Sequence, residues 1–267
     1  MTDQTTRTAL VTGASSGIGA AVAAALVRRG YRVYGTSRSP ESVAAPVPGV
    51  EYLALDLTDE ASIAACARAA GAVDVLVNNA GESQSGPLEE LPPEAVERLF
   101  RTNVFGAVRL TQLLLPGMRA RRFGRVVMVG SMLASFPLAY RSSYVASKAA
   151  LKGFADALRR EVSPYGVGVA TVEPGSINTG ISERRTQYIR PDSPFAPEYR
   201  TMLTALNANE AAGISAESVA ATIVRAIEAR PPRPLYAVGS NAPVVFALRR
   251  LFPRSLILRM VARKHGL

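Results

Sequence analysis

The stretch SSYVASKAAL, residues 142–151, places a tyrosine and a lysine four residues apart, Tyr144 and Lys148. Nothing in this stretch breaks a helix, and on a helix two residues at this spacing share one face, about one turn apart. A phenol beside an ammonium can exchange protons with a substrate, because a nearby cation lowers the pKa of an acid. Surface neighbours show the same spacing, so the pair by itself leaves both interpretations open.

A second candidate site is the glycine-rich stretch TGASSGIG, residues 12–19. It follows a short apolar stretch at 8–13 and opens an alanine-rich helical pattern at 16–30. Glycine allows a tight turn and a close approach of a pyrophosphate, while the helix N-terminus offers free N–H groups and a positive dipole end. With a strand before it and a helix after it, the stretch indicates dinucleotide binding rather than a plain tight turn. Its glycines are Gly13, Gly17 and Gly19.

The end of the second predicted strand, residues 31–38, indicates which dinucleotide is bound. Folds that bind NAD usually carry an acidic residue there, which holds the ribose 2′-hydroxyl. This chain instead has Ser37 and Arg38. A guanidinium pairs with a 2′-phosphate and a serine hydroxyl can add a hydrogen bond, so the sequence predicts NADP(H). The alternative is that Arg38 is a solvated loop arginine.

Strand patterns rich in Val and Leu alternate with helical patterns along the chain. This alternation predicts an α/β fold: a Rossmann-type doubly wound parallel sheet of about seven strands, with helices on both faces. The strands are predicted at residues 8–13, 31–38, 49–59, 73–81, 124–131, 166–176 and 234–239, and the longer helices at 16–30, 93–121 and 142–163.

The composition argues against several kinds of site. The chain has one cysteine, Cys66, and one histidine, His265, so we expect no internal disulfide, no metal site and no histidine-based triad. No run approaches eighteen uninterrupted apolar residues, and the N-terminus leads directly into a strand pattern. The cytoplasm is therefore the expected location.

The net charge of +10 is concentrated at one end of the chain. Residues 230–267 hold eight basic residues and no acidic one, which leaves 23 basic and 21 acidic residues in the first 229. The chain thus has a basic tail on a nearly neutral body, which does not favour nucleic acid as a partner.

Six stretches of the chain, in this order, resemble the motifs of the short-chain dehydrogenases/reductases. They are TGASSGIG (12–19), NNAG (78–81), Asn103, Ser131, YVASK (144–148) and PGSINTG (174–180). Tyr144 follows Ser131 by thirteen residues, the separation that this family uses. The resemblance covers about residues 7–240 and looks most like the NADP(H)-dependent steroid, retinol and carbonyl reductase branch.

The resemblance implies four catalytic residues. Tyr144 would donate a proton to a carbonyl or accept one from an alcohol, and Lys148 would lower its pKa. Ser131 would hydrogen-bond the substrate oxygen, and Asn103 would hold a water that relays protons from Lys148.

The resemblance also implies the residues that contact the cofactor. These are Gly13, Ser15, Ser16, Gly17, Ile18, Gly19, Ser37, Arg38, Asp56, Leu57, Asn79, Ala80, Gly81, Tyr144, Lys148, Pro174, Gly175, Ile177 and Thr179.

The residues predicted to contact the substrate are mostly apolar, with no charged pair awaiting a carboxylate or phosphate. They predict a hydrophobic ketone, aldehyde or secondary alcohol, although any one of the apolar candidates could instead belong to the core. The predicted contacts are Ser131, Leu133, Phe136, Tyr144 and Tyr188, and the further apolar candidates are Met132, Leu138, Ile181, Phe195, Tyr199 and Met202.

Residues 1–240 are predicted to form a single NADP-binding catalytic domain, with an irregular substrate loop at about 176–213. Residues 241–267 read as a basic amphipathic extension. Three roles stay open for it: a pair of helices, broken near Pro253, on an anionic membrane surface; a lid or subunit contact; or packing against the substrate loop. Family members are commonly dimers or tetramers, so the resemblance implies a homodimer or homotetramer.

The leading hypothesis is an NADP(H)-dependent oxidoreductase that transfers hydride between nicotinamide and a hydrophobic carbonyl or alcohol. One alternative is a regulatory sensor that binds NADP(H) without significant turnover. The other is a relative of the epimerases or dehydratases, which usually carry longer substrate domains. The intact set of Asn103, Ser131, Tyr144 and Lys148 favours the enzyme.

Overall fold

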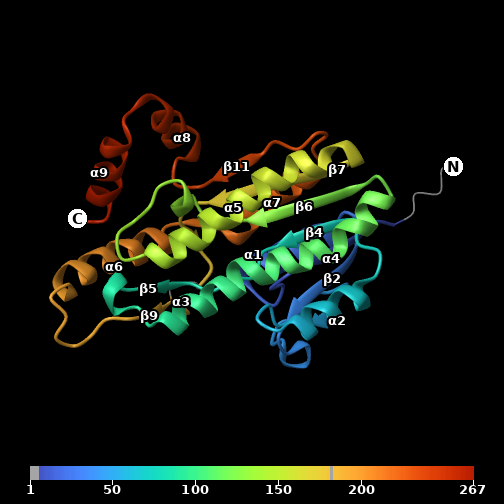
Figure 1. The fold of residues 1–267 in the computed structure, drawn as a ribbon, viewed down its shortest axis with the longest axis horizontal. Helices are drawn as coiled ribbons and strands as arrows, with labels where there is room; N and C mark the ends of the chain where they lie inside the picture. The colour runs from blue at the N-terminus through green and yellow to red at the C-terminus, as the bar shows by residue number, and fades with distance from the viewer. Residues whose placement is uncertain (1–5, 181–182) are drawn as a thin grey trace.

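A parallel sheet of seven strands forms the centre of the molecule, with helices on both of its faces (Figure 1). The computed structural model describes residues 6–180 and 183–267. Across the sheet the strands follow the order β11-β7-β6-β4-β1-β2-β3, and all neighbours are parallel. The predicted doubly wound α/β fold is therefore confirmed. The strands are β1 (Thr8–Val11), β2 (Arg32–Ser37), β3 (Val50–Ala54), β4 (Val75–Asn78), β6 (Gly124–Val129), β7 (Val167–Pro174) and β11 (Leu235–Val238).

The central strands are mainly apolar because both of their faces are covered. Every residue of β4 and β6 is buried. In β1, Ala9 and Val11 join the core cluster on one face of the sheet, whereas Leu10 joins the cluster on the other face. This alternation follows from the two-residue period of a strand, and it fixes which side chains meet which helices.

Each face of the sheet is covered by its own set of helices. On one face α1 (Gly17–Val27) packs with α7 (Ala216–Glu228), and on the other lie α2 (Glu60–Ala70), α4 (Gly106–Ala120) and α5 (Ser142–Val162). The start of α2 is fixed by Asp59, whose carboxylate accepts hydrogen bonds from the backbone N–H groups of the first turn.

The helix predicted over 93–121 is interrupted. The structure has α3 (Pro93–Phe100), a π-helical turn at Arg101–Phe105, and then α4. The wider turn brings Asn103 inward, where only 1% of it is exposed. The sequence pattern predicts 93–121 as one continuous helix, because a single π-helical turn is rare and short beside the helical pattern on both sides of it.

The order of the strands reverses between β1 and β4, and this is where the candidate site lies. In open parallel sheets, ligands bind at the carboxyl ends of the strands next to such a reversal. The chain supplies Gly13 after β1, Asn79 after β4, Ser131 after β6 and Gly175 after β7.

The predicted irregular loop over 176–213 is more ordered than the sequence suggested. It contains α6 (Ala196–Ala211), whose buried residues include Tyr199, Met202 and Leu206 at helical spacing. Two short pairings hold it to the body: β5 (Gln84–Ser85) with β9 (Thr186–Gln187), and β8 (Ile177–Asn178) with β10 (Ile214–Ser215).

The C-terminal extension forms the expected helix pair, α8 (Ala242–Leu251) and α9 (Arg254–Lys264), with the break at Phe252–Pro253. The two helices lie at one end of the molecule, beyond α6 and β11 (Figure 1). Within residues 6–180 and 183–267, no helix has the length and apolar character needed to span a bilayer.

Candidate active site

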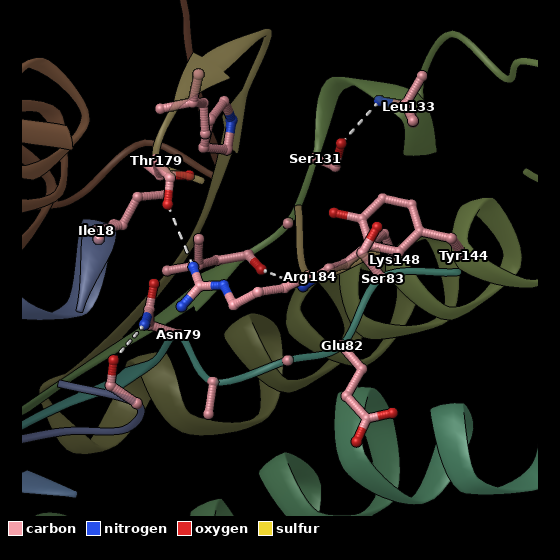
Figure 2. Close-up of a pocket in the computed structure, with 18 of the residues that line it drawn as sticks. Ile18, Asn79, Glu82, Ser83, Ser131, Leu133, Tyr144, Lys148, Thr179 and Arg184 are labelled. Carbon is pink, nitrogen blue, oxygen red and sulfur yellow. Dashed lines mark hydrogen bonds between the residues drawn. The ribbon is translucent and has the colours of Figure 1, made fainter. Parts of the chain in front are cut away.

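A cavity of about 1110 Å³ opens at the carboxyl ends of the sheet strands (Figure 2). Its walls come from the glycine-rich loop, the segments that follow β2, β4, β6 and β7, the first turns of α5, and the C-terminal helices. Figure 2 shows Ser131, Tyr144 and Lys148 grouped together, with Ile18, Asn79 and Thr179 across the cavity.

The glycine-rich loop needs its glycines for two reasons. Gly13 and Gly17 have φ angles of +66° and +55°, which disfavour a side chain. A Cβ on Gly19 would lie 2.1 Å from the carbonyl oxygen of Gly13. The loop is also tied down by Asn79, whose Nδ2 donates to the carbonyl oxygen of Thr12 at 2.9 Å.

The start of α1 is suited to an anion. Ser16 stands at the N-cap but makes no side-chain bond to the N–H groups of the first turn. Arg184 reaches across from the loop after β8 and donates to Ser16 Oγ at 2.9 Å and to the carbonyl oxygen of Thr179 at 3.2 Å. Free helix N–H groups and a guanidinium together favour a bound phosphate.

We expect Gly19→Ala to damage this loop. The added methyl group would collide with the Gly13 carbonyl, so the free energy of unfolding should fall by about 3 kcal/mol, the upper end for overpacking. Thermal unfolding and fluorescence titration with NADPH would measure the losses of stability and of affinity. Gly153→Ala is the matched control, because a Cβ at Gly153 meets nothing within 4 Å. Equal behaviour of the two variants would contradict the packing argument.

Ser37 and Arg38 line the cavity beyond the end of β2. Arg38 is exposed and forms no ion pair with any carboxylate of the described chain. Asp56 lies near it, and its pKa is lowered by hydrogen bonds from the backbone N–H and hydroxyl of Thr58, with a smaller contribution from Arg38. The guanidinium is therefore available for a ligand that carries a negative charge at this end.

Tyr144 and Lys148 share the cavity-facing side of α5, and both are buried. Lys148 Nζ donates to the carbonyl oxygen of Val129 at 3.0 Å and lies 5.9 Å from the centroid of the Tyr144 ring. Ser131 follows β6, and its Oγ accepts a hydrogen bond from the N–H of Leu133 at 3.2 Å. The three residues thus bring a phenol, an ammonium and a hydroxyl to one end of the cavity.

Asn103 lies behind this group rather than on the cavity wall. Its Oδ1 accepts from the N–H of Glu82 at 2.7 Å, and its Nδ2 donates to the carbonyl oxygen of Glu82 and to Ser147 Oγ. It therefore fastens the segment after β4 to α5. A Cβ on Gly81 would lie 2.9 Å from Asn103 Oδ1 and 3.5 Å from Lys148 Nζ, so the glycine keeps the space beside the lysine open.

Most of the residues predicted for the cofactor and the substrate meet in this one cavity. Gly19 and Asn103 lie behind its wall, and Tyr188 does not line it. The backbone N–H of Tyr188 donates a hydrogen bond to the carbonyl oxygen of Ser85 in β5, which holds Tyr188 beside that strand. The local sequence does not reveal this pairing. The predicted cofactor and substrate residues that do line the cavity are Gly13, Ser15, Ser16, Gly17, Ile18, Ser37, Arg38, Asp56, Leu57, Asn79, Ala80, Gly81, Ser131, Leu133, Phe136, Tyr144, Lys148, Pro174, Gly175, Ile177 and Thr179.

The further apolar candidates divide between the cavity and the core. Met132 lines the cavity, whereas Leu138, Tyr199 and Met202 belong to a core cluster beside it. Phe195 packs edge-on against Tyr140, at 6.4 Å between ring centroids. Ile181 falls outside the described residues.

The cavity wall also contains a buried cation, Arg141, which the sequence motifs did not indicate. Its guanidinium lies 4.5 Å from the centroid of the Tyr144 ring and donates to Ser83 Oγ at 3.0 Å, while its Nε and Nη1 have no hydrogen-bond partner in the described chain. Burial lowers the pKa of Arg141 to about 10, and the nearby Arg185 contributes. In the sequence, its position three residues before Tyr144 is the feature that could have indicated a place near the site.

We expect Arg141→Met to separate stability from activity. An apolar side chain of similar length removes a costly buried charge, so the melting temperature should stay the same or rise. The Tyr144 ring would lose the cation packed on its face, and kcat/KM should fall about tenfold because that contact helps to hold the ring. Thermal unfolding and the pH profile of turnover test both effects. A lower melting temperature with unchanged turnover would make Arg141 a purely structural residue.

The C-terminal helices complete the wall of the cavity. Val245, Val261, Lys264 and His265 line it, and Phe246 packs edge-on against Phe136 at 5.0 Å between ring centroids. The extension also contacts α6, since Val261 and Leu267 pack on the cluster that holds Met202 and Leu206. Of the three roles considered for this segment, packing against the substrate loop is thus seen in the structure.

Comparison with known proteins places this geometry in a family. The family model for short chain dehydrogenases matches residues 7–189. The chain is 33% identical to 3-ketodihydrosphingosine reductase from Bacteroides thetaiotaomicron over 244 residues, 89% of this chain and 90% of that protein. Among solved structures, a short-chain dehydrogenase from Streptomyces avermitilis superposes with a TM-score of 0.81 at 36% identity, covering 94% of this chain and 93% of that one.

A short chain dehydrogenase from Burkholderia cenocepacia, solved in complex with NADP, superposes with a TM-score of 0.77 at 27% identity. That match covers 96% of this chain and 97% of the other. The fold, the order of the motifs and the meeting of their residues in one cavity agree with these similarities. The chain belongs to the short-chain dehydrogenase/reductase family of oxidoreductases.

Proposed function

We propose that this protein is an NADP(H)-dependent oxidoreductase that transfers hydride between nicotinamide and a hydrophobic ketone, aldehyde or secondary alcohol. The observation that carries the proposal is one cavity with a glycine-rich loop and Arg38 at one end and Ser131, Tyr144 and Lys148 at the other. The similarity to the Bacteroides protein, named as a 3-ketodihydrosphingosine reductase, supports a ketone as substrate.

The residues present fit the cofactor. The loop around Gly13 and Gly17 leaves space that side chains would fill, and the first N–H groups of α1 are uncapped. Arg38 supports NADP(H) over NAD(H), and so does the similarity to the Burkholderia protein, which was solved in complex with NADP. When bound, the cofactor would supply or accept the hydride.

The chain itself supplies the proton chemistry. In the direction of reduction, the carbonyl oxygen would accept hydrogen bonds from Ser131 Oγ and from the Tyr144 hydroxyl, and Tyr144 would then transfer its proton to that oxygen as negative charge develops. Lys148 places its ammonium on the same face of α5, 5.9 Å from the centroid of the Tyr144 ring. The water relay through Asn103 remains a prediction.

The apolar part of the substrate would lie against Leu133, Phe136, Val245 and Val261. These side chains form the wall on the side of α8 and α9, next to Ser131. We expect turnover to rise with the size of the apolar group until this space is filled. The NADP(H) sensor remains the alternative function, and it predicts tight cofactor binding without turnover.

We also propose a homodimer or homotetramer in the cytoplasm. Phe105 and Phe154 are 57% and 46% exposed. They lie in the helical stretches 93–121 and 142–163, through which the resemblance to the family implies that subunits make contact. Light scattering of the purified protein measures the mass of the assembly, and a monomer would contradict this part of the proposal.

A further inference from the structure

Helices α8 and α9 and the turn between them carry exposed apolar side chains that do not line the cavity. Nine large hydrophobic residues of the described chain are strongly exposed, and five of them lie in this short helical hairpin. Leu251 and Phe252, at its tip, are 76% and 43% exposed. The other three are Val244, Leu258 and Met260. An exposed apolar cluster of this kind marks a surface that contacts something else.

Basic residues are interspersed with these apolar residues along the hairpin; of them, Lys264 lines the cavity and Arg249 lies over the Phe136 ring. None of them forms an ion pair with a carboxylate of the described chain, and residues 230–267 contain no acidic residue. Arg250 and Arg254 flank the tip directly and are exposed. The remaining basic residues of the hairpin are Arg249, Arg259, Arg263 and Lys264.

The opposite side of the same helices is already occupied. Ala242, Phe246 and Ile257 pack with Met132 and Phe136 to form a small core cluster. The hairpin is therefore anchored on the body while its tip and outer side stay free. Figure 1 shows the turn between α8 and α9 at the outer edge of the molecule.

We propose that this hairpin docks the protein on an anionic membrane surface. Apolar side chains flanked by arginines match the boundary between acyl chains and phosphate headgroups, because each kind of side chain meets its own partner there. A second copy of the chain fits less well, since a symmetric contact would bring two sets of unpaired arginines together. Nucleic acid would satisfy the arginines but leave the exposed apolar side chains in water.

Docking of this kind would also bring the opening of the cavity close to substrates in the bilayer. This point rests on the proposed function. Val245, Val261, Lys264 and His265 of the same two helices line its substrate end. A hydrophobic carbonyl compound dissolved in the bilayer would then enter beside the docked hairpin. The substrate class becomes a membrane-resident ketone or aldehyde, or the corresponding alcohol.

Flotation with vesicles tests the docking directly. We expect the wild-type protein to float with vesicles of phosphatidylcholine and phosphatidylglycerol, to float much less with phosphatidylcholine alone, and to be released by high salt. Two double variants address the tip: Leu251→Ser with Phe252→Ser, and Arg250→Glu with Arg254→Glu. Each should weaken binding at least tenfold. Because all four side chains are exposed, the fold should persist, and thermal unfolding checks this.

Leu88→Ser and Arg28→Glu are the matched controls, since both residues are exposed and lie outside the hairpin. Their vesicle binding should equal that of the wild type. Failure of the wild type to float, or equal flotation of the tip variants, would overturn the proposal. A change from oligomer to monomer in the tip variants, without vesicle binding by the wild type, would overturn it in favour of a subunit contact. Binding to a DNA duplex that survives the loss of Leu251 and Phe252 and exceeds vesicle binding would assign the surface to nucleic acid.

A separate measurement keeps this proposal distinct from the proposed function. Turnover of a water-soluble ketone should be the same in the wild type and in the Leu251→Ser/Phe252→Ser variant, because neither residue lines the cavity. Turnover of a ketone embedded in anionic vesicles should fall in that variant. Loss of vesicle binding by the variant, with intact turnover of the soluble ketone, would support docking by the hairpin. Absence of all turnover in the wild type would contradict the proposed enzyme function and leave the docking result unaffected.

Discussion

Tyr144→Phe is expected to lower kcat by about three orders of magnitude, within the range that a positioned acid or base contributes. The variant keeps the ring that packs under Arg141 and loses only the hydroxyl, so the fold and the affinity for NADPH should be unchanged. Steady-state turnover and fluorescence titration of NADPH measure the two quantities separately. Tight binding without turnover in the variant, beside an active wild type, is the result that the proposed role of the phenol requires.

Tyr140→Phe is the control for this substitution. Tyr140 lies four residues earlier, and its hydroxyl donates to Glu198 at 2.8 Å outside the cavity. Burial raises the pKa of Tyr140 to about 12, with a further contribution from the bond to Glu198, so this phenol is a poor proton donor. The control should retain wild-type turnover within a factor of about two. Residual activity of Tyr144→Phe at the level of this control would contradict a proton transfer by Tyr144.

Arg38→Asp is expected to reverse the preference between the two nicotinamide cofactors. A hydrogen bond to a charged group contributes about 1.5–3 kcal/mol, so loss of the guanidinium should weaken NADPH binding by roughly 10- to 150-fold. The new carboxylate would also repel a 2′-phosphate, and it could accept a hydrogen bond from the 2′-hydroxyl of NADH. The dissociation constants of both cofactors, measured by fluorescence titration, give the effect.

Two further variants separate loss of a contact from added repulsion. Arg38→Gln removes the charge without inverting it, and should give an intermediate weakening of NADPH with little change for NADH. Arg28→Gln removes a positive charge from the end of α1, away from the cavity, and should leave both constants unchanged. If the ratio of the two dissociation constants stays constant in Arg38→Asp, Arg38 is a solvated loop residue.

The fold was predictable because its signals are local. The strands of a parallel sheet are covered on both faces, so β4 and β6 appear in the sequence as mainly apolar stretches, interrupted by Asn78 and Arg125. The cofactor end was predictable for a similar reason, since the glycine-rich loop is one continuous stretch between a strand and a helix. At the catalytic end, the spacing of Tyr144 and Lys148 translates directly into one face of α5.

The features that the sequence did not reveal depend on contacts between distant segments. The pairing of β5 with β9 joins Gln84–Ser85 to Thr186–Gln187, and it moves Tyr188 away from the cavity. The wall formed by Val245 and Val261 depends on how the C-terminal helices fold back on Phe136. Sequence periodicity predicted both helices but could not place them in space.

Arg141 was missed for a chemical reason. A lone arginine in a sequence is usually a solvated surface residue, and its burial becomes visible only when the segment around Ser83 and the loop around Arg185 close over it. The substrate end was therefore predicted to be more apolar than it is.

The most direct test of the central claim is the fate of deuterium from NADPH labelled at C4 of the nicotinamide. The wild-type protein would be incubated with the labelled cofactor and a panel of hydrophobic ketones and aldehydes, with labelled NADH in parallel, and the alcohols analysed by mass spectrometry. An NADP(H)-dependent carbonyl reductase predicts deuterium on the carbinol carbon of the product, at a rate at least tenfold higher with NADPH than with NADH. Tight binding of NADPH with no deuterium in any product of the panel would contradict the claim and favour an NADP(H) sensor.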